Sequence, residues 1–293
     1  MGSAPRFIAE VSSNHGADLQ RSLAFIDRAA DIGCDGVKFQ LFKITQLFAP
    51  EILAKSHDHR ARVAWELPLE FIPELAARAR ERAIQFGCTP FYLEAVDVLE
   101  PHVDFLKIAS YELIWNDLLR ACGATGKPIV LSTGMANLQE VRDAVETLFN
   151  AGCRRLTLLH CVSGYPAKPY EANLSALVTL RDLSRNFQSL DLDVGWSDHT
   201  VEPGVLHRAI HRYGAQMIEF HFDLDGKGEE YAVGHCWKPD PISHLIRDTR
   251  IAFRSDGDGR KIPAAREREE RNWRADPTDG LRPVRSFRES FAR

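Results

Sequence analysis

Polar and ionisable side chains recur at one end of each of eight apolar segments in this sequence. In chain order they are Glu10, Ser12, Ser13, Asn14 and His15; Lys38 and Gln40; Thr89 and Phe91; Lys107, Ser110 and Glu112; Ser132 and Thr133; His160, Ser163 and Tyr165; Ser197, Asp198 and His199; and Glu219, His221 and Asp223. If the segments are parallel strands, their carboxyl ends share one edge, and these side chains line one site.

Two lysines within this set indicate an anionic substrate. Lys38 and Lys107 each lie inside a strand-like apolar run, where a charged side chain is expensive to bury without a partner. One such lysine is compatible with a structural ion pair, but two facing one site favour an anion. Ser and Thr hydroxyls nearby suit phosphate or carboxylate oxygens. We therefore predict a substrate that carries at least one such group.

Two histidines on neighbouring segments are candidate metal ligands. His199 and His221 end the seventh and eighth runs, so their imidazoles can converge on one divalent cation with positions left open for water or substrate. Their spacing is equally compatible with one general-base histidine and one structural histidine. His15, His160 and His235 are weaker candidates. The sequence contains no G-x-S-x-G motif and no P-loop, which argues against a serine hydrolase and a P-loop nucleotidase.

The elements that must position these residues alternate regularly between strand and helix. Strands are predicted over 7–13, 36–42, 88–92, 105–110, 128–133, 155–163, 193–199 and 217–223. Helices are predicted over 18–33, 69–87, 93–102, 116–126, 137–152, 175–187, 201–214 and 240–253. The strands are continuous apolar runs, as in a parallel sheet buried on both faces. Eight β/α units in this length predict a (β/α)₈ TIM barrel. A doubly wound sheet is the alternative, but no G-x-G-x-x-G follows the first strand.

Composition restricts the class of protein and its partners. The chain has 293 residues, 44% hydrophobic and 27% charged, with a formal net charge of −4. These values predict a globular protein without nucleic-acid or membrane partners. Six cysteines without a C-x-x-C pair predict buried thiols in a reducing cytoplasm. We expect a barrel domain over 1–254 and, over 255–293, a C-terminal arm that cannot build its own core. The arm either lies on the barrel or a partner subunit, with Trp273, Leu281 and Phe287 as anchors, or forms a disordered tail.

Several motifs together resemble one enzyme family. FIAEVSSNHGADLQRSLAFIDRAADIGCDGVKFQLFK resembles the opening of the sialic acid synthase family, which reads approximately I-A-E-x-x-x-N-H-x-G-D and later V-K-F-Q. CTPF, KIASYE, GKPIVLSTGMA, LLHCVSGYP, VGWSDHT and IEFHF continue the match in the same order, over residues 7 to about 225. The family includes synthases of N-acetylneuraminate, legionaminate and pseudaminate. An aromatic residue in KIASYE favours the pseudaminate-like branch.

The resemblance implies a condensation of phosphoenolpyruvate (PEP) with an aldose, such as N-acetylmannosamine or a related hexosamine, to a sialic-acid-like 2-keto acid and phosphate. It also implies a cytoplasmic homodimer that requires Mn²⁺, Mg²⁺ or Co²⁺. The residues implied to hold PEP are Lys38, Thr89, Lys107, Ser110, Ser132, Ser163 and Ser197. Those implied to face the sugar are Gln40, Phe91, Glu112 and Tyr165, and the metal ligands are His199 and His221. In the implied reaction we expect Glu10 and Glu112 to stabilise positive charge developing at C2, and either a carboxylate or the metal to activate water.

Two departures from the family pattern concern the sugar. After HFDLD the family continues with a Gly-Pro-Asp-His segment, whose aspartate reaches the sugar, but this chain reads GKGEEYAVGHCW. We expect Glu230, or its neighbour Glu229, to take that role. Full-length relatives also carry a C-terminal antifreeze-like domain whose arginine meets the N-acyl group. We expect no such domain here, so either Arg282, Arg285 or Arg288 substitutes, or the acceptor lacks the acyl group, or the protein works differently.

Two other functions remain open at this point. One is a metal-dependent aldolase or lyase that acts on a keto acid without PEP. The other is a catalytically silent barrel that binds sugar acids or regulates a partner. The intact histidines and lysines argue against the silent barrel.

Overall fold

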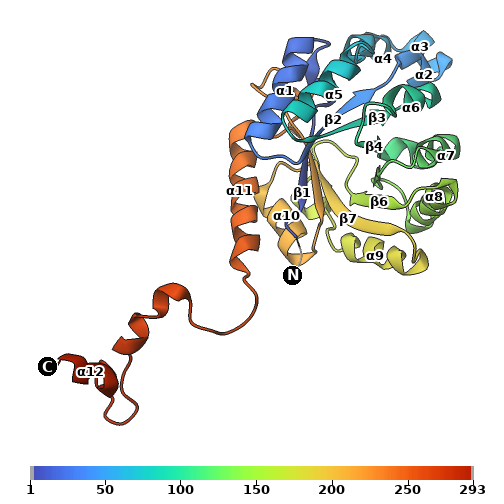
Figure 1. The fold of residues 1–293 in the computed structure, drawn as a ribbon. Coiled ribbons are helices and arrows are strands. Elements are labelled where there is room, and N and C mark those ends of the chain that lie inside the picture. Colours follow the sequence, from blue (N-terminus) through green and yellow to red (C-terminus); the bar gives the residue numbers. More distant parts are fainter. Residues whose placement is uncertain (1–2, 292–293) are drawn as a thin grey trace. The chain divides into compact units, whose positions relative to one another are not determined.

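Eight parallel strands close into a barrel in the computed structural model, which describes residues 3–291 (Figure 1). Each strand pairs with its neighbours in chain order, and β8 pairs with β1. The strands are β1 Arg6–Glu10, β2 Gly36–Leu41, β3 Gln85–Pro90, β4 Phe105–Ile108, β5 Ile129–Ser132, β6 Arg155–His160, β7 Asp191–Asp198 and β8 Met217–His221. The predicted TIM barrel is therefore confirmed.

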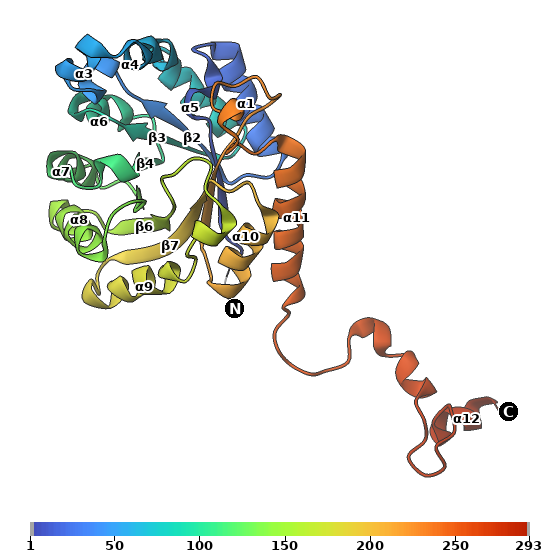
Figure 2. The same ribbon diagram turned by 180° about the vertical axis from the view of Figure 1, so that it is seen from behind.

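Helices follow the strands and surround the barrel (Figure 2). The α-helices are α1 Leu19–Asp31, α2 Ile44–Leu47, α3 Pro50–Lys55, α4 His57–Ala61, α5 Phe71–Glu81, α6 Leu93–Leu99, α7 Asn116–Ala124, α8 Leu138–Ala151, α9 Ala176–Asp182, α10 Pro203–His207, α11 Pro239–Ser255 and α12 Arg285–Phe291. A π-helix, Arg208–Arg212, continues α10. The three short helices α2, α3 and α4 lie in the long connection between β2 and α5, for which the sequence analysis predicted no element.

The first β/α unit shows how local sequence defines the elements. The Asp18 side chain accepts a hydrogen bond from the Arg21 backbone N–H at 2.9 Å, so it caps α1 as its position predicts. Gly33, at φ +89°, turns the chain after the helix in a conformation that favours glycine. On the buried face, Phe25, Ile26 and Ala29 are fully covered and pack into the core between helices and strands.

Strand register brings particular side chains to the same level of the barrel. Glu10 on β1 pairs with Lys38 on β2 and with His221 on β8. Ser197 on β7 pairs with Glu219 on β8. Because side chains at paired positions of parallel strands are neighbours, this register sets which charges meet at the carboxyl end of the barrel.

The boundary between α5 and β3 differs from the sequence prediction. The predicted helix 69–87 was too long, because α5 ends at Glu81 and β3 already begins at Gln85. Ala83, at φ +54°, lies in the short turn between them. Helical periodicity continues through the apolar residues of this turn, so it does not reveal the strand start. The predicted strand 88–92 correspondingly begins and ends too late.

The chain divides after Phe253 into the barrel and a C-terminal segment from Arg254 onward. Within the segment, the rings of Trp273, Phe287 and Phe291 contact one another with centroids 5.3–6.1 Å apart. Arg288 donates two hydrogen bonds to the Asp279 carboxylate, at 2.6 and 2.8 Å. Of its described residues only Asp276 is buried, so the segment folds locally around an exposed aromatic cluster.

All six cysteines are free and buried, as the sequence analysis predicts. Among the described residues, no helix has the length and apolar character that a membrane crossing requires.

Candidate active site at the carboxyl end of the barrel

Lys38 is buried at the centre of a small polar cluster on the first three strands. It forms an ion pair with Glu10 on β1, and its Nζ donates a hydrogen bond to Thr89 Oγ1 on β3 at 3.0 Å. Glu10 also accepts a hydrogen bond from the Ser12 backbone N–H at 2.7 Å. Ser12 adopts φ +48°, a strained conformation for a serine that aims this N–H back at the carboxylate.

Lys107 on β4 also lies near a carboxylate, that of Glu219 on β8 across the barrel. Its Nζ lies 3.8 Å from the Glu219 carboxylate, which also accepts a hydrogen bond from Ser197 Oγ at 2.9 Å. All three side chains are buried. Burial opposes the charged form of Glu219, but the two lysines, Lys107 before Lys38, outweigh it and hold the pKa of Glu219 below its usual range.

Burial lowers the pKa of Lys38 to about 8, and Lys107 adds to this effect by repulsion, whereas Glu219 acts against it. A second negative group would stabilise the charged ammonium form. The two lysines and their hydroxyl neighbours therefore form a site suited to an anion, as the residue types predict.

Glu112 is a buried carboxylate that forms no ion pair with a basic side chain in the described part of the chain. It ends the 3₁₀ helix Ser110–Glu112 that follows β4, it is 9% exposed, and its Oε2 has no hydrogen-bond partner among the described residues. Burial raises its pKa to about 7, although Lys107 acts to lower it. A carboxyl group with a pKa near neutrality can exchange a proton during a reaction.

Three serines predicted to bind an anion lie at the ends of β4, β5 and β6. Ser132 is the last residue of β5 and is buried, and Ser163 Oγ is buried and has no hydrogen-bond partner within residues 3–291. A Cβ added to Gly134 would come within 2.3 Å of Ser163 Oγ and 2.5 Å of Ser110 Oγ. The two hydroxyls therefore converge on this glycine, whose lack of a side chain leaves room for both.

Two of the residues predicted to contact a sugar lie at the ends of β2 and β3. Gln40 Nε2 donates to Glu10 Oε1 at 3.4 Å, so it belongs to the Lys38 cluster. Phe91 follows β3, and its ring packs edge-on against Phe42 with centroids 6.1 Å apart. These contacts place Gln40 beside the candidate anion site and Phe91 beside the loop after β2.

His199 and His221 converge, as their positions at the ends of the seventh and eighth predicted strands predict; His199 directly follows β7, and His221 is the last residue of β8. Their ring centroids lie 5.3 Å apart, and the ring of Tyr165 lies 4.3 Å from that of His199. His199 Nδ1 lies 2.7 Å from the Val162 carbonyl, which leaves Nε2 as the nitrogen available to a ligand. Burial first, and then repulsion from His221, lowers the pKa of His199 to about 3, so the imidazole is neutral and able to bind a metal.

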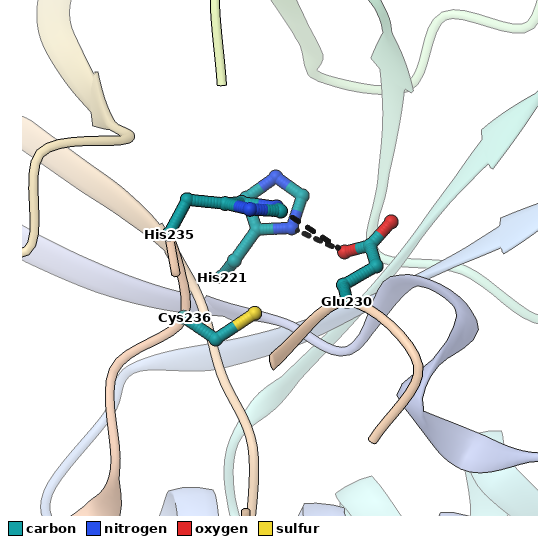
Figure 3. Close-up of side chains that lie close together, drawn as sticks. All are labelled: His221, Glu230, His235 and Cys236. Carbon is teal, nitrogen blue, oxygen red and sulfur yellow. Dashed lines mark hydrogen bonds and ion pairs between the residues drawn. The ribbon is translucent and has the colours of Figure 1, made fainter. Parts of the chain in front are cut away.

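Glu230 and His235, from the segment after β8, extend the histidine pair (Figure 3). Glu230 Oε2 lies 2.8 Å from His221 Nδ1 and 3.6 Å from His235 Nε2. Its Oε1 accepts a hydrogen bond from Ser12 Oγ at 2.5 Å. Burial opposes the charged form of Glu230, but His221, His235 and Ser12 outweigh it and hold its pKa far below the usual range. The sulfur of Cys236 lies beside this group.

Asp198 supports the loop that carries His199. It is fully buried and accepts hydrogen bonds from Trp196 Nε1 at 3.0 Å, Trp237 Nε1 at 2.8 Å and Thr200 Oγ1 at 2.7 Å. The carboxylate thus joins the end of β7 to the segment that returns after β8. It does not face the barrel mouth.

The sequence analysis missed or undervalued two residues. Glu219 was placed on the eighth strand but given no role, although it lies two residues before His221 and so faces the same side of β8. His235 was ranked as a weaker candidate metal ligand. Only its proximity to His221 in space reveals it, since the chain returns beside β8 at Trp237.

Several known proteins with similar sequences are synthases of acidic sugars. The N,N'-diacetyllegionaminic acid synthase of Campylobacter jejuni is 36% identical over 278 residues, covering 90% of this chain and 80% of that protein. The pseudaminic acid synthase of Helicobacter pylori is 32% identical over 234 residues, covering 75% of this chain and 66% of that protein.

A solved structure and a family model agree with these relatives. The crystal structure of N-acetylneuraminic acid (sialic acid) synthetase from Leptospira borgpetersenii, in complex with citrate, superposes with a TM-score of 0.77 at 30% identity, covering 92% of this chain and 90% of that one. The NeuB family model matches residues 25–261. The resemblance stated from the motifs is confirmed, and the chain belongs to the NeuB family.

Proposed function

We propose that this protein is a transferase that forms a C–C bond, condensing PEP with an aldose to give a sialic-acid-like 2-keto sugar acid and phosphate. The relatives that make legionaminic, pseudaminic and sialic acids support this reaction class. N-acetylmannosamine or a related hexosamine is the acceptor that we favour.

The observation that carries the proposal is the pair of buried lysines in one barrel mouth. Lys38 and Lys107 are 2% and 3% exposed, and hydroxyl groups of Thr89 and Ser197 lie in their clusters. PEP carries a phosphate and a carboxylate on the same carbon, C2, so two cations at one site match its two anionic groups. We assign Lys38, Thr89, Lys107, Ser110, Ser132, Ser163 and Ser197 to PEP.

Glu112 is our candidate for the group that takes a proton from water. In the proposed reaction C3 of PEP forms a bond to the aldehyde carbon, water adds at C2, and the C2–O bond to phosphate breaks. Glu10 and Glu219 are paired with lysines, whereas Glu112 has an unpartnered oxygen and a pKa of about 7. A base with that pKa accepts a proton near neutral pH and can return it. Glu10 lies where it can stabilise positive charge that develops at C2.

The histidine side of the mouth suits a divalent cation and the sugar. His199 is neutral and oriented by Val162, and His221 lies beside it, so the donor set fits Mn²⁺, Co²⁺ or Mg²⁺, the last least well because it prefers oxygen ligands. When bound, the cation would supply Lewis-acid polarisation of the aldehyde oxygen. Tyr165, 41% exposed above His199, together with Gln40 and Phe91, is assigned to the sugar.

A panel of N-acylated and non-acylated aldoses, each incubated with PEP and Mn²⁺, tests the proposal through release of inorganic phosphate. We expect phosphate and a keto acid in equal amounts, only when all three components are present. Absence of turnover with every aldose, or turnover with pyruvate in place of PEP, would overturn it. The predicted homodimer is checked separately by sedimentation.

A further inference from the structure

We propose that Glu230 and His235 are direct ligands of the divalent cation, completing with His199 and His221 a centre of three imidazoles and one carboxylate. This deepens the proposed function and rests on it for the role of the cation. The family resemblance led us to expect Glu230 at the sugar. The geometry points instead to the metal.

The first argument is the position of both oxygens of Glu230. Oε1 is held by Ser12 at 2.5 Å, and Oε2 lies between nitrogens of His221 and His235, at 2.8 and 3.6 Å (Figure 3). Each oxygen of Glu230 therefore already has a polar partner in the protein, and Oε2 is the one that faces the histidines. Donor atoms bound to one metal at 2.0–2.1 Å lie about 3.0–3.4 Å apart, so the spacing of Oε2 and its two neighbours is close to that of a shared coordination sphere.

The second argument is the spacing of the three imidazoles. The ring centroids of His221 and His235 lie 4.5 Å apart, those of His199 and His221 5.3 Å, and those of His199 and His235 6.3 Å. A ring bound through nitrogen has its centre about 3.2 Å from the metal, so two rings on one ion have centres at most about 6.4 Å apart. All three pairs satisfy this limit.

The third argument is that the segment carrying these ligands is fixed by the barrel. Trp237 N donates to the His221 carbonyl at 2.8 Å, which returns the chain beside β8 and places His235 next to His221. Asn14 Oδ1 accepts from Glu230 N at 2.9 Å, and Asn14 Nδ2 donates to the Phe222 carbonyl at 3.0 Å. One side chain from the end of β1 therefore clamps both ends of the stretch leading to Glu230.

The fourth argument is an unexplained polar atom. His235 is 4% exposed, and its Nδ1 has no hydrogen-bond partner among the described residues. A buried imidazole with one unsatisfied nitrogen is costly unless the group serves a function. Ligation of a cation through Nε2 would supply such a function for this ring, which contacts the rings of His221 and Tyr165.

Such a centre has consequences for binding. Two histidines alone hold a cation weakly and exchange it readily, whereas four protein ligands, one of them anionic, hold it through dialysis and repeated turnovers. An octahedral ion would keep two positions for substrate oxygens or water. The set of imidazole and carboxylate donors favours Mn²⁺, Fe²⁺, Co²⁺ or Zn²⁺ over Mg²⁺ and Ca²⁺.

The test counts imidazoles and measures affinity without turnover. X-ray absorption of the Co²⁺-loaded full chain should show three imidazole ligands, and His235→Gln should show two. Calorimetric titration with Co²⁺ should give at least about 100-fold weaker affinity for His235→Gln and Glu230→Gln, beyond the range typical of groups that only orient a ligand. Glu229→Gln, on the exposed neighbouring carboxylate, and His244→Gln, on an exposed histidine of α11, are the controls and should match the parent protein.

Two imidazoles in the parent protein, or unchanged affinity in His235→Gln, would overturn the inference. The imidazole count of the parent protein decides the matter even if a variant fails to fold. If the ligand count and affinities come out as expected but no aldose reacts, the metal centre stands and the proposed function falls. If turnover occurs with only two imidazoles on the metal, the function stands and this inference falls.

Discussion

In the lysine half of the barrel mouth both lysines and their paired carboxylates stand on strands, whereas in the histidine half Glu230 and His235 stand on the segment after β8. Glu10, Lys38, Lys107 and Glu219 are placed by strand register, and their partners lie on other strands of the same sheet. Glu230 and His235 are placed by hydrogen bonds to Asn14 and by the return of the chain at Trp237. Register positions groups through the whole sheet, and a loop positions them through a few contacts.

This difference suggests how one barrel accommodates different acceptors. The half that we assign to PEP is tied to the barrel itself and is hard to alter without changing the strands. The half that we assign to the cation and sugar depends on a segment that can change sequence while the sheet stays the same. The departure of GKGEEYAVGHCW from the family pattern falls in this segment.

Lys38→Met should produce the largest effect, because it removes a PEP contact and leaves Glu10 buried without its partner. We expect loss of measurable PEP binding and a decrease of about 3–5 kcal/mol in the free energy of unfolding. Calorimetry with PEP and urea unfolding measure the two effects. The double variant Lys38→Met/Glu10→Gln should recover most of the stability and none of the PEP binding. Recovery of both would show that Lys38 is only a structural ion-pair partner.

The lysine half, whose paired charges stand on strands, was largely predictable from the sequence. The physical reason is the regular alternation of apolar strand and helix segments along the chain. The eight strands, the cap at Asp18 and the convergence of His199 with His221 all follow from runs of apolar residues and from the rule that parallel strands share one carboxyl edge. The start of β3 was misplaced because helix and strand are both apolar there. Even so, Thr89 lies within both the predicted and the observed strand.

The part of the histidine half that lies on the segment after β8 was not predictable in the same way. His235 and Glu230 are five residues apart in a polar segment, and no periodic pattern says which side chain turns toward the barrel. Their positions depend on Asn14, more than 200 residues earlier in the chain. Pairing of Lys107 with Glu219 across the barrel is likewise a contact in space that spacing along the chain does not reveal.

Glu112→Gln should change how stability depends on pH. Burial raises the pKa of Glu112 from its ordinary value of 4.5 to about 7, so between these values the folded protein keeps a proton that the unfolded chain releases. The contribution of this group to stability is therefore present below pH 4.5 and is lost as the pH rises to 7, by about 3 kcal/mol in total. Urea unfolding at pH 5 and pH 8 should show this decline in the parent protein relative to the variant. Equal differences at both pH values would contradict the assignment.

Asp198→Asn tests the link between the two halves, because this carboxylate joins β7 to Trp237 at the end of the loop. The variant replaces one acceptor oxygen by an amide that faces donors, so we expect a loss of about 2 kcal/mol in the free energy of unfolding. Near-ultraviolet circular dichroism should report changed packing of Trp196 and Trp237. Asp191→Asn, at the exposed start of the same strand, is the control. An unchanged spectrum and stability would mean that the loop does not depend on this carboxylate.

Gly228→Ala should change cation binding in the histidine half and leave PEP binding in the lysine half unchanged, although its effect should be the smallest. A Cβ at this position would lie 2.3 Å from Asn14 Oδ1 and 2.4 Å from Asp223 Oδ1, so the segment must shift and carry Glu230 with it. We expect about tenfold weaker cation binding, equivalent to about 1.4 kcal/mol, with PEP affinity in the absence of metal unchanged. Gly204→Ala, where an added Cβ meets nothing within 4 Å, should alter neither. A loss of PEP affinity in Gly228→Ala would contradict this separation. It would show that a shift of the loop after β8 also moves the strands that carry Lys38 and Lys107.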